Sequence, residues 1–106
     1  MKRFNYIEPT TVDEVLDKLN EYGDDAKLIA GGTALVTFMK NDLVSPPLVV
    51  GLRRVKPLLF LSHPGEVRIG ALTTIQELAN SAFIAANAPL LASACRQVAT
   101  VRIRMM

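Results

Sequence analysis

The chain has 106 residues, 50% of them hydrophobic, and its 12 basic and 10 acidic side chains leave a net charge of +2. This length suits one small domain, and the near balance of charge, with only short basic clusters such as Arg53-Arg54 and Arg102 with Arg104, argues against a nucleic-acid surface. No apolar run reaches the length of a membrane span and the first residues lack a signal-peptide core, so we expect a cytoplasmic protein without a membrane span.

A short strand and a helix are the first predicted elements. Residues 4–7 form an apolar and aromatic run that Pro9 ends, which predicts a strand. Thr11 and Glu14 have the spacing of a capping box, and apolar residues then recur with helical spacing until Gly23. Because the apolar face is narrow and the opposite face is charged, we expect this helix to cover one side of a sheet.

The next stretch leads from a strand into a glycine turn. Residues 28–30 indicate a short buried strand, and Gly31 and Gly32 remove two Cβ atoms where the chain must turn. Thr33 is placed to cap a second helix over residues 34–41. Free N–H groups at such a turn attract an anion, usually a phosphate, but a tight turn without a ligand explains this motif alone equally well.

Two prolines, Pro46 and Pro47, then break the chain before a third strand. Residues 48–50 form a continuous apolar run, which is typical of a strand buried on both faces. Strands that alternate with helices pair in parallel. We therefore expect residues 27–30 and 48–50 to pair in parallel, with the helix at residues 11–22 packed on them.

The second half of the chain predicts a hairpin and short helices. Residues 59–62 and 67–70 are the two strands of the hairpin. Residues 73–77 hold two overlapping capping boxes for a helix through Ala79, and residues 81–83 continue into a second short helical piece.

A last helix starts at Pro89. Its predicted apolar side consists of Leu90, Leu91, Ala94, Cys95 and Val98. Cys95 is the only cysteine, so this chain alone supplies no disulfide, iron–sulfur cluster or Cys-rich zinc site, and its apolar surroundings favour a buried structural thiol. His63 is the only histidine and lies in a turn sequence. We predict no catalytic and no metal-binding residue.

The expected hydrophobic core comes from the first two predicted helices and from the second and third predicted strands. It consists of Leu16, Leu19, Ile29, Val36, Phe38 and Val49. The last residues, 101–106, indicate the approach to another element, which favours a fragment over a frayed natural terminus.

The order of these motifs resembles the N-terminal part of the FAD-binding, or medium, subunit of molybdenum hydroxylases, which include aerobic carbon monoxide dehydrogenase and xanthine dehydrogenase. The resemblance is carried by residues 4–14, 30–35, 39–40, 48–50, 69–74 and 98–104. It implies an α/β fold: the small N-terminal subdomain of a PCMH-type, or vanillyl-alcohol-oxidase-like, FAD-binding domain, with a short parallel sheet, flanking helices and a hairpin. Residues 1–106 would then be an incomplete domain that lacks the second flavin loop and the C-terminal domain.

The resemblance also implies a site for FAD. In the family, a loop Ala-Gly-Gly-Thr-Asp-Leu lies on the FAD pyrophosphate through its backbone amides. The cofactor-binding residues carried over are Lys27, Leu28, Ile29, Ala30, Gly31, Gly32, Thr33, Ala34, Leu35, Val98 and Ala99. Two positions depart from the family pattern: Ala34 replaces an acidic or polar residue, and Met105 replaces the Asn that precedes the second flavin loop.

For function, the resemblance implies an electron-transfer subunit that passes electrons from iron–sulfur clusters through FAD to an external acceptor. The implied partners are an iron–sulfur (small) subunit and a molybdopterin (large) subunit, and substrate chemistry belongs to another subunit. Two alternatives stay open: a different flavoenzyme of the same fold, and a non-catalytic docking module that has lost flavin binding.

Overall fold

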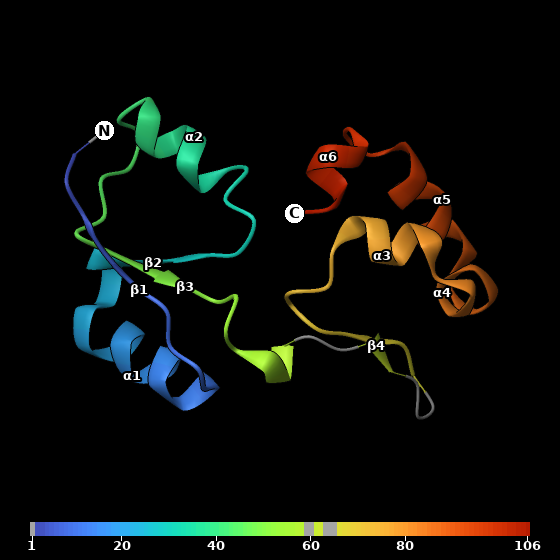
Figure 1. The fold of residues 1–106 in the computed structure, drawn as a ribbon, viewed down its shortest axis with the longest axis horizontal. Coiled ribbons are helices and arrows are strands. Elements are labelled where there is room, and N and C mark those ends of the chain that lie inside the picture. Colours follow the sequence, from blue (N-terminus) through green and yellow to red (C-terminus); the bar gives the residue numbers. More distant parts are fainter. Residues whose placement is uncertain (1, 59–60, 63–65) are drawn as a thin grey trace. The chain divides into compact units, whose positions relative to one another are not determined.

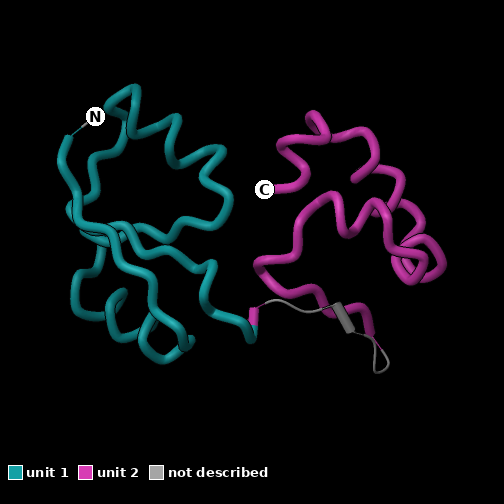
Figure 2. Tube along the Cα trace, in the orientation of Figure 1, with its two compact units in different colours: residues 1–57 teal, residues 58–106 magenta. Residues whose placement is uncertain are grey.

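The computed structural model describes residues 2–58, 61–62 and 66–106. Its elements are β1 (Asn5–Ile7), α1 (Val12–Tyr22), η1 (Gly23–Asp25), β2 (Ala26–Ile29), α2 (Leu35–Lys40), β3 (Leu48–Gly51), η2 (Lys56–Leu58), β4 (Leu61–Ser62), β5 (Arg68–Ile69), α3 (Ile75–Asn80), α4 (Ala82–Asn87), α5 (Pro89–Gln97) and α6 (Val101–Arg104), where η marks a 3-10 helix (Figure 1). They form two compact units, residues 1–57 and 58–106 (Figure 2). None of the helices described is long and apolar enough to cross a membrane.

Unit 1 is organised on a three-stranded parallel sheet with β3 between β1 and β2. Within the β2–β3 pair, Lys27 lies opposite Val49 and Ile29 lies opposite Gly51. All four residues of β3 are buried, because the strand has a neighbour on either side and helices cover the faces. The predicted α/β fold, the parallel pairing and the fully buried third strand are confirmed.

Helix α1 begins and ends where its sequence signals predict. The Thr11 hydroxyl accepts a hydrogen bond from the Glu14 N–H at 3.1 Å. The Glu14 carboxylate reaches back to the N–H of Thr10, at 3.4 Å, rather than to that of the cap residue. Gly23 ends the helix with a φ of +55°, a conformation that glycine adopts without steric cost.

Two predicted core residues are wrong: Leu16 is 55% exposed and Phe38 is 45% exposed. Each is next to a residue that is buried instead, Val15 in α1 and Met39 in α2. Consecutive side chains point about 100° apart around a helix, so when one is buried its neighbour lies at the edge of the buried face. Of the other four predicted core residues, Val49 is buried, and Leu19, Ile29 and Val36 are partly buried.

Unit 2 begins with the predicted hairpin. β4 and β5 pair antiparallel, with Leu61 opposite Ile69 and Ser62 opposite Arg68. The ordered ladder is shorter than the strands predicted over 59–62 and 67–70. Residues 59 and 60, and the predicted turn with His63, lie outside the described residues.

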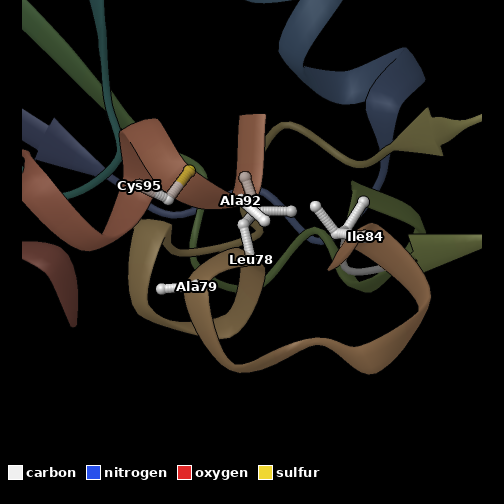
Figure 3. Close-up of a cluster of buried hydrophobic side chains, with 5 residues drawn as sticks. All are labelled: Leu78, Ala79, Ile84, Ala92 and Cys95. Carbon is white, nitrogen blue, oxygen red and sulfur yellow. The ribbon is translucent and has the colours of Figure 1, made fainter. Parts of the chain in front are cut away.

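Helices α3, α4 and α5 enclose the core of unit 2 (Figure 3). The buried side chains are Leu78, Ala79, Ile84, Ala92 and Cys95. Two of the helices start at side-chain caps: the Thr74 hydroxyl accepts from the Glu77 N–H at 3.1 Å, and the Ser81 hydroxyl accepts from the Ile84 N–H at 3.2 Å. The predicted helix starts and the burial of the Cys95 thiol are confirmed.

The predicted apolar side of α5 is mostly wrong. Of its five residues only Cys95 is buried, and Leu90 is 85% exposed. The helix turns Ala92 and Cys95 inward, because small side chains let α3 and α4 pack closely against it. Residues 101–104, where no element was predicted, form α6, whose N-terminus is capped by the Thr100 hydroxyl.

Candidate functional site

The predicted cofactor loop lies at the carboxyl end of the parallel sheet of unit 1. β2 ends at Ile29 and α2 begins at Leu35, so residues 30–34 connect them. The Leu52 N–H donates to the Ile29 carbonyl oxygen at 3.1 Å and closes the ladder at this point. Because the strands are parallel, β1 and β3 end at the same edge, where open α/β sheets usually bind their ligands.

Gly32 has a local structural requirement for glycine. Its φ is +80°, in the left-handed region that side chains rarely adopt. A Cβ atom there would stand 3.2 Å from both Ile29 Cδ1 and Val36 Cγ2. The expectation that glycine is needed where the chain turns is confirmed at Gly32.

The prediction that Thr33 caps the second helix is wrong. Ala34 occupies the N-cap position and no side chain caps α2. Instead, the Thr37 hydroxyl donates a hydrogen bond to the Thr33 carbonyl oxygen, at 3.0 Å. The helix therefore begins at residue 35 instead of 34, and the Thr33 side chain stays exposed.

Because no side chain caps α2, the backbone N–H groups that precede it lack a hydrogen-bond acceptor among the described residues. Among the hydrogen bonds of the described residues, none uses the N–H groups of residues 30–35 as donors. Ala30, Thr33 and Ala34 are exposed and both glycines of the loop are partly exposed. α2 has only six residues, so the amides themselves, more than a helix dipole, make this loop suited to an anion.

The other predicted site residues divide between the two units. Lys27 and Ile29 lie on one face of β2 and Leu28 on the other, so the three side chains do not converge. Val98 and Ala99 belong to unit 2, directly after α5. Ala99 has a φ of +52°, which is uncommon for a residue with a Cβ atom.

A polar cluster at the same edge of the sheet was not predicted as part of the site. Glu8 follows β1, and its carboxylate accepts hydrogen bonds from the Tyr6 hydroxyl at 3.1 Å and from Arg53 Nε at 3.0 Å. Arg54 Nε lies 2.9 Å from the same carboxylate. The pair Arg53-Arg54 was visible in the sequence as a basic cluster, but nothing local linked it to Glu8, which is 45 residues away.

The cluster perturbs three pKa values. The hydrogen bond to Glu8 raises the pKa of the Arg53 guanidinium. The hydrogen bond from Arg53 lowers the pKa of the Glu8 carboxyl below its ordinary value of 4.5. Desolvation and the hydrogen bond to Glu8 raise the pKa of the Tyr6 hydroxyl. At neutral pH the carboxylate is therefore ionised and the phenol is protonated.

Comparison with known proteins places the whole chain in one family. Residues 2–106 match the family described as "FAD binding domain in molybdopterin dehydrogenase". The chain is 36% identical over 103 residues to the carbon monoxide dehydrogenase medium chain of Hydrogenophaga pseudoflava, covering 96% of this chain and 36% of that protein. It is 36% identical over 102 residues to the 6-hydroxypseudooxynicotine dehydrogenase complex subunit alpha of Paenarthrobacter nicotinovorans, covering 95% of this chain and 34% of that protein.

Solved structures agree. The reconstituted CO dehydrogenase from Oligotropha carboxidovorans superposes with a TM-score of 0.96 at 34% identity, over 99% of this chain and 37% of that chain. The carbon monoxide dehydrogenase of Hydrogenophaga pseudoflava gives 0.93 at 36% identity, over 97% of this chain and 36% of that chain. The chain thus spans about a third of the length of its relatives. The PCMH-type fold and FAD as the family's cofactor are supported, and the chain belongs to the family of FAD-binding domains of molybdopterin dehydrogenases.

Proposed function

We propose that this chain is part of the FAD-binding electron-transfer subunit of a molybdenum hydroxylase-type dehydrogenase, and that residues 30–35 hold the diphosphate of FAD. The observation that carries the proposal is the run of backbone N–H groups at the carboxyl end of the sheet that find no acceptor among the described residues. Runs of open backbone amides are suited to binding phosphate oxygens. Membership of an FAD-binding family identifies the phosphate compound as FAD.

Each predicted residue has a distinct part in this proposal. Gly31 and Gly32 present amides without Cβ atoms beside them, and the exposed Thr33 hydroxyl is free of capping and can donate to a phosphate oxygen. Ala34 offers its amide only. Lys27, Leu28, Ile29 and Leu35 support the loop from the two elements it connects. Val98 and Ala99, in unit 2, are proposed as cofactor-binding residues from the family resemblance alone. When bound, FAD supplies reversible one- and two-electron redox chemistry.

The names of the relatives support a role within a larger assembly. They include a "medium chain" and a "complex subunit alpha". We propose that this chain works in the cytoplasm beside an iron–sulfur (small) subunit and a molybdopterin (large) subunit. Iron–sulfur clusters would deliver electrons to the flavin, and an external acceptor would take them up. With one cysteine, this chain leaves the cluster ligands to a partner.

Isothermal titration of FAD tests the loop assignment. We expect weak binding by residues 1–106, because each charge-assisted hydrogen bond contributes about 1.5–3 kcal/mol and a site of one loop lacks several that a complete domain has. Gly31→Ala is a better test than a substitution of Gly32, since positive φ values occur at Gly23 and Gly32 but not at Gly31, so alanine fits the backbone there. Its new methyl group should lower the affinity about tenfold or more.

Two further measurements complete this test. Thr33→Ala should have a smaller effect than Gly31→Ala, because it removes one hydroxyl and leaves the amides. Thermal unfolding of each variant shows that the fold is retained. FAD affinity that is unchanged in Gly31→Ala would contradict the assignment of the diphosphate to this loop. Tight stoichiometric binding by the chain alone would contradict the expectation that one loop is too little.

A further inference from the structure

Two guanidinium groups share one carboxylate at the edge of the sheet. Oε2 of Glu8 lies 3.0 Å from Arg53 Nε and 2.9 Å from Arg54 Nε, while Oε1 accepts the Tyr6 hydroxyl. The side chain of Glu8 is only 18% exposed, whereas those of Arg53 and Arg54 are 71% and 61% exposed. The carboxylate is therefore the fixed centre of the cluster, and the outer parts of both arginines face solvent.

The cluster has more positive charge and more donors than its partners use. Two cations and one anion leave an excess of one positive charge. Each guanidinium carries five N–H donors. The contacts of the described residues engage only the Nε groups, so the Nη groups of both arginines remain open to a second anion. A second anion would also reduce the repulsion between two like charges that are held on the same oxygen atom.

The cluster and the glycine loop leave the sheet side by side. The Leu52 N–H donates to the carbonyl oxygen of Ile29, the last residue of β2. Arg53 directly follows Leu52, and Ala30 directly follows Ile29. The turn that carries the two arginines and the loop that carries the open amides therefore start from hydrogen-bonded positions on adjacent strands.

We propose that Arg53 and Arg54, held by Glu8, are a second anion contact for the diphosphate group that the glycine loop binds. The Nη groups donate to phosphate oxygens, for which the planar guanidinium is well suited. Glu8 acts as a positioning residue, since its carboxylate holds both Nε groups, and Tyr6 acts through Glu8, since its hydroxyl donates to that carboxylate. This inference rests on the proposed function, because it needs an anion at residues 30–35.

A titration of the ¹⁵N-labelled chain with inorganic pyrophosphate, and separately with ADP, tests the proposal by NMR at about 0.1 M salt. The signals to follow are the N–H groups of Gly31 and Gly32 and the Nε–H groups of Arg53 and Arg54. The variant R53Q/R54Q removes both charges. The matched control K2Q/R3Q removes two exposed charges of the same unit just before β1, at the amino end of that strand.

We expect the loop and arginine signals to shift along one binding curve. R53Q/R54Q should weaken pyrophosphate binding about fivefold or more, and K2Q/R3Q less than about twofold, because unpaired charges in water are screened within about 10 Å at moderate salt. ADP should behave like pyrophosphate in both comparisons.

Three results would overturn the proposal, and they separate it from the proposed function. If the loop signals shift but R53Q/R54Q behaves like K2Q/R3Q, the arginines only tie β1 to β3 and the loop assignment stands. If the arginine signals shift alone, the anion is not shared and the loop assignment fails as well. If no signal shifts at millimolar pyrophosphate, both fail.

Discussion

The aromatic ring of Tyr6 lies against Gly51, in the space that a side chain of residue 51 would occupy. A Cβ atom on Gly51 would stand 2.7 Å from Cζ and 3.2 Å from Cε1 of that ring, and closer still to the phenolic oxygen. The hydroxyl is held in place by its hydrogen bond to Glu8. The central strand thus needs glycine at this position because a side chain from the neighbouring strand crosses it.

The first prediction is that Gly51→Ala destabilises unit 1. The ring of Tyr6, which is 48% exposed, must move aside into solvent and lose its hydrogen bond to Glu8, which costs about 0.5–1.5 kcal/mol. Urea unfolding measures the change. The same substitution in a Tyr6→Ala background should cost clearly less, and an equal cost in both backgrounds would show that the ring is not the cause.

The second prediction concerns pH. Because its folded-state pKa is lowered, chiefly by the hydrogen bond from Arg53, ionised Glu8 stabilises the fold above its unfolded pKa of about 4.5. This contribution is lost as the pH falls from there through the lower folded pKa. The difference in melting temperature between the native chain and Glu8→Gln should be constant near neutral pH and shrink in acid. A difference that persists unchanged in acid would rule out the ion pairs as its source.

The third prediction compares two neighbours in α2. Met39 is buried, and Met39→Ala should cost about 2–5 kcal/mol. Phe38 is 45% exposed, so Phe38→Ala should cost about 1 kcal/mol or less, although it removes the larger side chain. Parallel urea denaturation curves give both values. The reverse order would mean that α2 turns its other side to the sheet.

The fourth prediction concerns the backbone of Ala99. A left-handed conformation costs a residue with a Cβ atom about 1–2 kcal/mol, which glycine avoids. Glycine also lowers the free energy of unfolding by about 0.4–1 kcal/mol relative to alanine, because it gives the unfolded chain more conformational entropy. Ala99→Gly should therefore leave stability unchanged or raise it by up to about 1 kcal/mol. The matched control is Ala94→Gly, exposed in α5, which should lower stability by about 1 kcal/mol. A loss of similar size in both variants would contradict the strain at Ala99.

The features that were predictable from the sequence are those that depend on neighbours along the chain. The caps at Thr11 and Thr74 each involve an N–H three residues ahead, so their spacing is visible directly. Residues 48–50 form a continuous apolar run, which is typical of a strand buried on both faces.

The features that escaped prediction depend on contacts between distant segments. Whether Leu16 or Val15 is buried is decided by the tilt of α1 on the sheet, which a heptad-like pattern does not fix. Thr33 has the chemistry of a cap, but the turn at Gly32 places Ala34 there instead. The link from Glu8 to Arg53 spans 45 positions and exists only because β1 and β3 are adjacent.

The strand order of unit 1 constrains how the protein can fold during its synthesis. β1 and β2 each pair with β3, which lies between them and is the last of the three to leave the ribosome. While residues 48–51 are still inside the exit tunnel, neither earlier strand has its neighbour in the sheet. α1 closes its capping box with residues close in sequence and can form earlier. The parallel sheet, and with it the edge that carries the glycine loop, therefore assembles in one step, once residues 48–51 have emerged.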